Sequence, residues 1–311
     1  MSILTLTLNP ALDLTVSLEQ LALGSVNLAK SGHLGAAGKG INVARVLSDL
    51  GHTPKVSGFL GLDNDAAFRA LFNQHGIDDA FVRLTGNTRV NVKVSEASGR
   101  VTDINLPGLQ VSDTEWNRLL ARLESLANGF DTLVVAGSLP PGVRPQQLEG
   151  MIEMWRERGK QVLLDASGGA LKAGIKGLPS LIKPNIDELA DLVGRPVSEG
   201  MDLVACAREI QAQGIAHVVV SAGEEGVHWF GPRGYWRAQV PQVKVVSTVG
   251  AGDSLVAGLC AGFVEGLSEE QTLRRACALS VMAVTQVGVG IRNQKELHGY
   301  EQAIVVERVE V

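Results

Sequence analysis

A run of small residues that ends in a carboxylate lies towards the C-terminus: Ser247-Thr248-Val249-Gly250-Ala251-Gly252-Asp253-Ser254. Apolar residues at helical spacing follow it from Val256 to Phe263, so the run is expected to open a helix. Amides at a helix N-terminus bind developing negative charge, and Asp253 beside them can remove a proton. This chemistry suits phosphoryl transfer to an alcohol. The structural alternative makes Asp253 a helix cap.

A second glycine-rich run is Gly35-Ala36-Ala37-Gly38-Lys39-Gly40-Ile41-Asn42, and it also precedes a helical pattern. Glycines let a backbone approach a ligand closely where the helix dipole favours an anion. Two familiar nucleotide loops are excluded by spacing, because Gly40 replaces the Ser or Thr of a Walker A loop and the order G-x-x-G-x-G is not the dinucleotide fingerprint. A glycine-rich turn into a core helix is an equal alternative.

A third cluster, Lys183-Pro184-Asn185-Ile186-Asp187-Glu188-Leu189, follows a predicted strand. On a first helical turn Asn185 and Glu188 share a face, so their oxygens could hold a hydrated Mg²⁺. Pro184 and the carboxylates also make an ordinary helix start, which the spacing alone favours.

Charged or polar residues alternate with valines from Arg89 to Val94, which predicts a half-exposed antiparallel strand with one polar face. A short turn leads to a partner strand at Arg100–Leu106, and with the segment between Leu14 and Leu34 these strands are expected to form a small flap.

The polar face of this strand carries two cations, Arg89 and Lys93. Together with Lys39 they can converge on one phosphate group. The alternative is that they only solvate an exposed strand.

The elements that must position these residues alternate along the chain. Short apolar runs predict strands at Ile3–Leu8, Lys55–Phe59, Thr132–Ala136, Val162–Asp165, Leu181–Lys183 and His217–Ser221. Helical spacing predicts helices at Asp113–Asn128, Pro145–Gly159, Met201–Gln213 and Glu269–Val287. This order predicts an α/β fold with a mostly parallel sheet, helices on both faces and ligands beyond the carboxyl ends of the strands. Without linkers or repeats, residues 1–311 are expected to form a single domain.

Composition excludes several function classes. The 311 residues carry 28 Lys and Arg against 33 Asp and Glu, and no basic block suggests nucleic acid or an anionic membrane as partner. The sequence has no signal-peptide pattern and no long apolar stretch, so a soluble, cytoplasmic protein is expected. Cys206, Cys260 and Cys277 lack disulfide or zinc spacing and are expected to be buried thiols.

Taken together, the motifs resemble the ribokinase-like (phosphofructokinase B type) family of carbohydrate kinases. The shared motifs occur in the family's order along essentially the whole chain: Asn9-Pro10-Ala11-Leu12-Asp13, Ala37–Asn42, Ala136-Gly137-Ser138-Leu139-Pro140, Lys183-Pro184-Asn185 with Glu188, and Val249–Asp253. The resemblance implies a three-layer αβα sandwich with a small β-sheet lid formed by segments about 12–35 and 87–107.

Within the family, three segments look most like bacterial members that act on fructose 1-phosphate: Thr88–Lys93, Thr102–Asn105 and Val246–Gly250. This likeness implies an ATP-dependent kinase that phosphorylates the 6-hydroxyl of D-fructose 1-phosphate, giving D-fructose 1,6-bisphosphate and ADP. Relatives that act on tagatose 6-phosphate or fructose 6-phosphate share Lys39 and an arginine like Arg89, and they are the competing interpretation.

The resemblance also implies the residue roles. Asp253 is the catalytic base, and the amides of Gly250, Ala251 and Gly252 stabilise the transferring phosphoryl group. The phosphosugar site comprises Asp13, Gly38, Lys39, Asn42, Arg89 and Ser138, to which the strand pattern adds Lys93. ATP lies along Lys183, Ser221, Gly223, Gly226 and Thr248, while Asn185 and Glu188 organise Mg²⁺ through water. Relatives often have Leu-Gly after this serine, whereas this chain has Ala222-Gly223. The resemblance therefore defines the first contact of the loop Ser221–Gly226 with ATP less closely than the others.

Two further hypotheses concern partners. A catalytically silent phosphosugar sensor is the alternative from a different class, and the intact Gly250–Asp253 run argues against it. The valine face of the flap must be covered, so we predict a homodimer through the lid.

Overall fold

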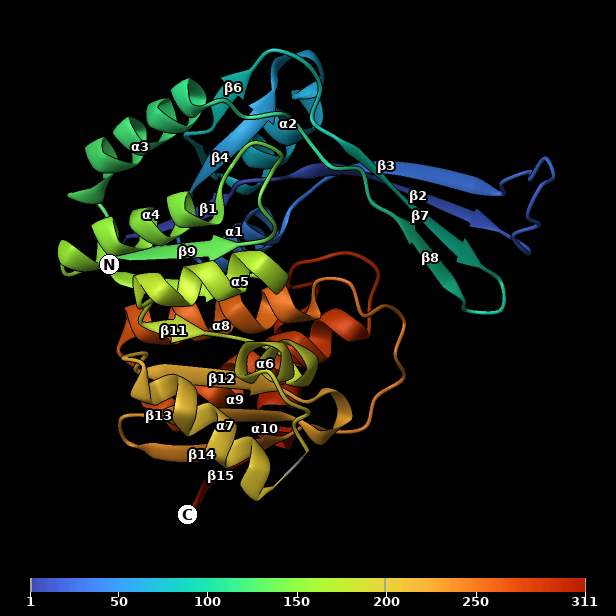
Figure 1. Ribbon diagram of the computed structural model, residues 1–311. Helices are drawn as coiled ribbons and strands as arrows, with labels where there is room; N and C mark the ends of the chain where they lie inside the picture. Colours follow the sequence, from blue (N-terminus) through green and yellow to red (C-terminus); the bar gives the residue numbers. More distant parts are fainter. Residues whose placement is uncertain (1, 199, 311) are drawn as a thin grey trace.

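The computed structural model describes residues 2–198 and 200–310, and a large sheet runs through its centre (Figure 1). The strand order is β15-β14-β13-β12-β11-β10-β9-β1-β4-β5, and β6 also pairs with β4. The strands are β1 Ile3–Thr7, β4 Lys55–Gly61, β5 Asp78–Asp79, β6 Val82–Leu84, β9 Thr132–Ala136, β10 Gln161–Asp165, β11 Leu181–Ile182, β12 His217–Ser221, β13 Val227–Gly231, β14 Gly234–Gln239 and β15 Val305–Val309.

Neighbouring strands from β12 to β5 are parallel, which confirms the predicted mostly parallel sheet. The remaining pairs, from β12 through β13 and β14 to β15, are antiparallel. No strand was predicted after Ser221, so this antiparallel edge was not expected from the sequence.

Helices cover both faces of the sheet (Figure 1). They are α1 Lys39–Asp49, α2 Ala66–His75, α3 Asp113–Ala127, α4 Pro145–Glu157, α5 Gly168–Gly174, α6 Ile186–Val193, α7 Met201–Ala212, α8 Ala251–Glu265, α9 Glu269–Val284 and α10 Gln294–Ala303, with short 3₁₀ helices at Leu62–Asn64, Ile175–Gly177 and Gly223–Glu225. Leu133 and Val135 of β9 pack with α3 to α7, whereas Val134 and Ala136 pack with α1, α8, α9 and α10. Burial on both faces explains why the parallel strands are continuously apolar.

A separate four-stranded sheet projects from this body as the lid, in the order β3-β2-β7-β8 (Figure 1). Its strands are β2 Ala11–Leu18, β3 Ser31–Ala37, β7 Val90–Glu96 and β8 Val101–Ile104. β7 is antiparallel to β8, as predicted, and parallel to β2. The small sheet is thus confirmed, while the assignment of residues 1–311 to a single domain stays a prediction.

The register of the lid separates an apolar face from a polar one. Leu14 pairs with Val92, and Asp13 pairs with Asn91. Because successive residues of a strand point to opposite faces, the valines lie on one side of the lid and the polar residues on the other.

Two sequence predictions about the body concern its thiols and its helices. Cys206, Cys260 and Cys277 are free and buried, as predicted. Within residues 2–198 and 200–310, every helix is too short or too polar to cross a bilayer.

Candidate active site

Polar residues stand just beyond the carboxyl ends of adjacent parallel strands: Ser138 after β9, Asp165 at the end of β10, Lys183 after β11 and Ser221 at the end of β12. The carboxyl ends of parallel strands meet at one edge of a sheet, where ligands bind in α/β folds. The helices α1 and α8 add further residues at this edge. Lys39 of α1 contacts Asp165, and Asn42 of α1 bonds Asp253 of α8.

The start of α8 has the features of an anion site. Its N-cap Gly250 has a φ of 81°, a left-handed conformation that favours glycine. The N–H groups of Gly252 and Asp253 donate to no described residue, whereas that of Ala251 donates to the Thr248 carbonyl at 3.4 Å. Two amides at the positive end of a helix are therefore free to bind an anion.

Asp253 is 6% exposed, and its Oδ2 accepts a hydrogen bond from Asn42 Nδ2 at 2.7 Å. Burial and the neighbouring Asp165 carboxylate raise the pKa of Asp253 to about 6, against the opposing effects of Lys39, Asn42 and Lys183. A carboxylate with a pKa near neutrality is suited to accept a proton. Asp253 is thus able to act as the predicted base.

Asp165 is the residue that the sequence analysis missed. Its carboxylate is 1% exposed and lies 3.1 Å from Lys39 Nζ and 3.3 Å from Lys183 Nζ. Burial alone would raise the pKa of Asp165, but the Lys183 and Lys39 ammonium groups outweigh it and hold the pKa below its usual value. The signal was a carboxylate that ends a predicted strand, and it was used only to place the strand.

Lys39 is the first residue of α1, next to Gly40. A Cβ at position 40 would lie 2.6 Å from Thr7 Oγ1 and 2.8 Å from the Leu6 carbonyl oxygen. Glycine is therefore required for α1 to pack directly on β1, independently of any ligand. Burial alone would lower the pKa of Lys39, but the Asp165 and Asp253 carboxylates outweigh it and hold the pKa above its usual value, so the ammonium stays charged in the site.

The polar face of the lid carries Asp13 and Lys93 in separate contacts. Asn91 Nδ2 donates to Asp13 Oδ1 at 3.1 Å, while Lys93 Nζ lies 2.8 Å from Asp103 Oδ1. No contact among the described residues joins Lys93 to Lys39. The expected convergence of these cations on one phosphate stays a prediction.

Arg89 lies where the lid joins the body. Its guanidinium donates to the backbone carbonyls of Asn9 at 2.8 Å, Pro10 at 3.2 Å and Leu106 at 2.7 Å. Burial lowers the pKa of Arg89, and the nearby Asp13 carboxylate opposes this shift. In this conformation the guanidinium fixes the strand connections and is not paired with any carboxylate of the described chain.

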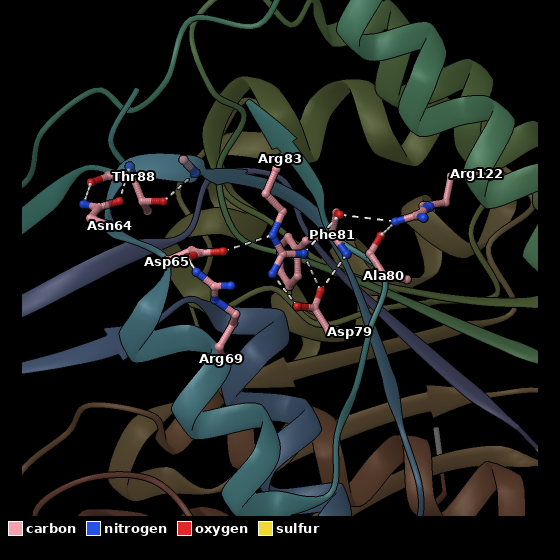
Figure 2. A network of polar contacts seen from close by, with 10 residues as sticks. Asn64, Asp65, Arg69, Asp79, Ala80, Phe81, Arg83, Thr88 and Arg122 are labelled. Carbon is pink, nitrogen blue, oxygen red and sulfur yellow. Dashed lines mark hydrogen bonds and ion pairs between the residues drawn. The ribbon is translucent and has the colours of Figure 1, made fainter. Parts of the chain in front are cut away.

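A polar network fixes the backbone of Thr88, the residue before Arg89 (Figure 2). Thr88 N–H donates to Asn64 Oδ1 at 2.8 Å, and Asn64 Nδ2 donates to the Thr88 carbonyl at 2.8 Å. Next to Asn64, Asp65 pairs with Arg69 at 2.6 Å and with Arg83 at 3.3 Å. The start of β7 is therefore held rigidly against the body.

Ser138 reaches the same junction through Asn9, whose carbonyl accepts a bond from Arg89. Its Oγ accepts a hydrogen bond from Asn9 Nδ2 at 3.2 Å. A Cβ on the preceding Gly137 would lie 3.9 Å from Lys39 Cβ, so this turn packs against the start of α1. The turn thereby places Ser138 next to the glycine-rich run that carries Gly38.

Asn185 and Glu188 form the capping box that opens α6. Asn185 Oδ1 accepts from Glu188 N–H at 2.7 Å, and Glu188 Oε2 accepts from Asn185 N–H at 2.9 Å. Glu188 Oε1 accepts no hydrogen bond from a described residue. In the described part of the chain no group of three His, Cys, Asp or Glu side chains is placed to ligate a metal. The contacts of this pair are those of a helix cap, and its expected role with Mg²⁺ stays a prediction.

Of the five residues expected to bind nucleotide, four end or follow β11 and β12: Lys183, Ser221, Gly223 and Gly226. Lys183 is 6% exposed, and Asn185 pairs with Ser221 in an isolated β-bridge. Gly223 opens a 3₁₀ turn, and Gly226, with a φ of 97°, closes it against β14. Thr248 is joined to the start of α8 through its carbonyl, which accepts the Ala251 N–H.

Comparisons with known proteins identify the family of the chain. The family model of the pfkB family carbohydrate kinases matches residues 6–296. The 1-phosphofructokinase of Vibrio cholerae is 49% identical over 304 residues, covering 98% of this chain and 96% of its own. The 1-phosphofructokinase of Escherichia coli K12 is 45% identical over 293 residues, covering 94% of each.

A solved structure has the same fold. Phosphofructokinase-2 from Escherichia coli, in complex with substrates and products, superimposes with a TM-score of 0.90 at 29% identity, covering 97% of this chain and 99% of its own. The match of the family model to nearly the whole chain confirms the resemblance inferred from the motifs. The chain belongs to the pfkB family of carbohydrate kinases.

Proposed function

We propose that this kinase transfers the terminal phosphoryl group of ATP to the 6-hydroxyl of D-fructose 1-phosphate. The observation that carries the proposal is the start of α8, where a buried carboxylate with a pKa of about 6 adjoins two free helix N-terminal amides. Relatives at 45% and 49% identity named 1-phosphofructokinase support the choice of substrate.

In the proposed reaction Asp253 accepts the proton of the 6-hydroxyl as its oxygen attacks the terminal phosphorus of ATP. The new O–P bond forms while the bond between that phosphorus and the oxygen of ADP breaks. The amides of Gly250, Ala251 and Gly252 stabilise charge on the transferring group, and Asn42 orients the base. The N–H of Ala251 would first have to release the Thr248 carbonyl, which it contacts at the long distance of 3.4 Å.

The phosphosugar lies between the lid and the body, in contact with Asp13, Gly38, Lys39, Asn42, Arg89, Lys93 and Ser138. Arg89 and Lys93 bind the 1-phosphate, which requires Lys93 to exchange Asp103 for phosphate and Arg89 to turn from backbone carbonyls to the ligand. An arginine fork suits the planar, bidentate recognition of phosphate.

ATP lies along Lys183, Ser221, Gly223, Gly226 and Thr248. Mg²⁺, which neutralises charge on the nucleotide phosphates when bound, is held through water by Asn185 and Glu188. Glu188 Oε1, which accepts no hydrogen bond from the described residues, supports this assignment.

The lid also supports a homodimer. Leu34 and Ile104 on its apolar face are 48% and 54% exposed. Apolar patches of this kind mark protein contacts, and a second lid offers a self-complementary partner. The enzyme would then act in the cytoplasm as a dimer that covers both apolar faces.

A substrate panel tests the proposal. We expect kcat/KM for fructose 1-phosphate to exceed that for fructose 6-phosphate and tagatose 6-phosphate by at least ~10²-fold, since only the correct position of the phosphate brings a free hydroxyl to Asp253. A preference for either 6-phosphate would overturn the substrate assignment and leave the kinase assignment intact. No turnover with any of them would favour the phosphosugar sensor.

A further inference from the structure

The segment between α9 and α10 packs on Gly250, the N-cap residue of α8. A Cβ added to Gly250 would lie 2.4 Å from Val289 Cγ2, so the side chain of Val289 fills the space left by the glycine. Within the segment, Gln286 Nε2 donates to the Gly290 carbonyl at 2.6 Å. We call residues 285–293 the α9–α10 loop. Its position sets the space around Gly250.

Two side chains of α1 form hydrogen bonds with the backbone of this loop. Arg45 Nη2 donates to the Val289 carbonyl at 3.0 Å, and Asp49 Oδ2 accepts from Ile291 N–H at 2.7 Å. A Cβ at Gly290, where φ is 120°, would lie 2.7 Å from Asp49 Oδ2. The loop backbone therefore lies directly on the Asp49 carboxylate.

Asn42, Arg45 and Asp49 are three and four residues apart, so they lie on one face of α1. Asn42 at one end of this face bonds the catalytic base at 2.7 Å, and Asp49 at the other end bonds the loop. The same helix begins with Lys39, which belongs to the sugar site in our proposal. One rigid helix thus connects the base, the sugar site and the loop on Gly250.

We propose that Arg45 and Asp49 are positioning residues, which hold the α9–α10 loop against Gly250 and couple the nucleotide site to the sugar site through α1. The identities of the two ligands rest on the proposed function. Neither side chain touches substrate. Their contribution is the position of the start of α8, where the loop packs on Gly250 and Asn42 bonds the Asp253 carboxylate.

Calorimetric titration of the full-length protein with a non-hydrolysable ATP analogue and Mg²⁺, with and without fructose 1-phosphate, tests the proposal. We expect Asp49→Ala to weaken the nucleotide analogue about tenfold, the loss expected when the loop lies against Gly250 in only about one tenth of the molecules. In the wild type, fructose 1-phosphate should enhance the affinity for the nucleotide analogue. In Asp49→Ala this enhancement should be lost, while the affinity for fructose 1-phosphate alone should stay within about twofold of the wild type. Asp49→Asn should restore both, because its amide oxygen still accepts the Ile291 N–H.

His75→Ala is the matched control. It removes the contact between His75 Nδ1 and Asp49 Oδ1 at 3.6 Å and leaves the bond to Ile291 intact, so nucleotide affinity should not change. If Asp49→Ala fails to fold, Arg45→Met, which keeps the aliphatic stem and loses the bond to Val289, should show the same selective loss of nucleotide affinity.

Three results would overturn the proposal: unchanged nucleotide affinity in Asp49→Ala and Arg45→Met, an equal loss of both ligands in every variant, or no rescue by Asp49→Asn. The titration without sugar does not depend on which sugar is phosphorylated. A wild-type enzyme that binds nucleotide but does not turn over fructose 1-phosphate would refute the proposed substrate and leave this inference to be decided by the variants.

Discussion

Asp253→Asn should make the protein less active and more stable at the same time. Burial and Asp165 raise the pKa of Asp253 from 3.8 to about 6, which corresponds to ~3 kcal/mol against its ionised form. Asparagine has no ionised form, yet its side-chain oxygen can still accept the bond from Asn42. The free energy of unfolding at pH 8 should therefore rise by up to ~3 kcal/mol, while kcat falls at least ~10²-fold.

The sign of the pH dependence gives this prediction its test. Between pH 6 and pH 4 the folded wild type binds a proton at Asp253 that the unfolded chain does not, so its stability gains on the variant as the pH falls. Urea unfolding at several pH values should show the gap closing over that range. Asp202→Asn is the control with the opposite sign, because hydrogen bonds from Ser198 hold the pKa of Asp202 below its usual value. A variant less stable than the wild type at pH 8, or a gap independent of pH, would refute the electrostatic argument.

Four further expectations follow from the same contacts. The kcat/KM of the wild type should fall as the pH drops below about 6, when Asp253 becomes protonated, and a profile flat to pH 5 would exclude it as the base. Asp165→Asn leaves two lysines without their buried partner, so urea unfolding should show a loss of about 3–5 kcal/mol. Burial and Arg237 lower the pKa of His228 to about 4, so the unfolded chain binds a proton there between pH 6.5 and 4 that the folded chain does not. As the pH falls through this range, the free energy of unfolding of the wild type should drop by about 1.4 kcal/mol per pH unit relative to that of His228→Gln, measured by urea titration. Ile104→Asp should convert a lid dimer to monomers in sedimentation, and a wild type that is already monomeric at micromolar concentration would exclude the dimer.

The sequence predicted those parts of the fold in which the pattern of apolar residues along a segment matches the faces that are buried. The run Thr132–Ala136 is continuously apolar because both faces of β9 are covered, and its bounds were predicted without error. The antiparallel edge was missed because β13 and β14 mix aromatic residues with His228 and Arg237, which gives neither a clear alternation nor an apolar run.

The site shows the same division. The glycine-rich starts of α1 and α8 could be predicted because their motifs are local in sequence. The ion pairs of Asp165 join residues 126 and 18 positions apart, and no local pattern indicates which cations meet a buried carboxylate. For the same reason, the contacts that occupy Arg89 and Lys93 could be found only in three dimensions.

Phosphorus NMR of the reaction of ATP and fructose 1-phosphate tests the central claim most directly. Phosphoryl transfer to the 6-hydroxyl should convert the single sugar phosphate resonance into the two monoester resonances of fructose 1,6-bisphosphate, with one ADP formed for each bisphosphate. In Asp253→Asn the same signals should appear at least ~10²-fold more slowly. ADP and inorganic phosphate without a bisphosphate, or an undiminished rate in the variant, would contradict the account.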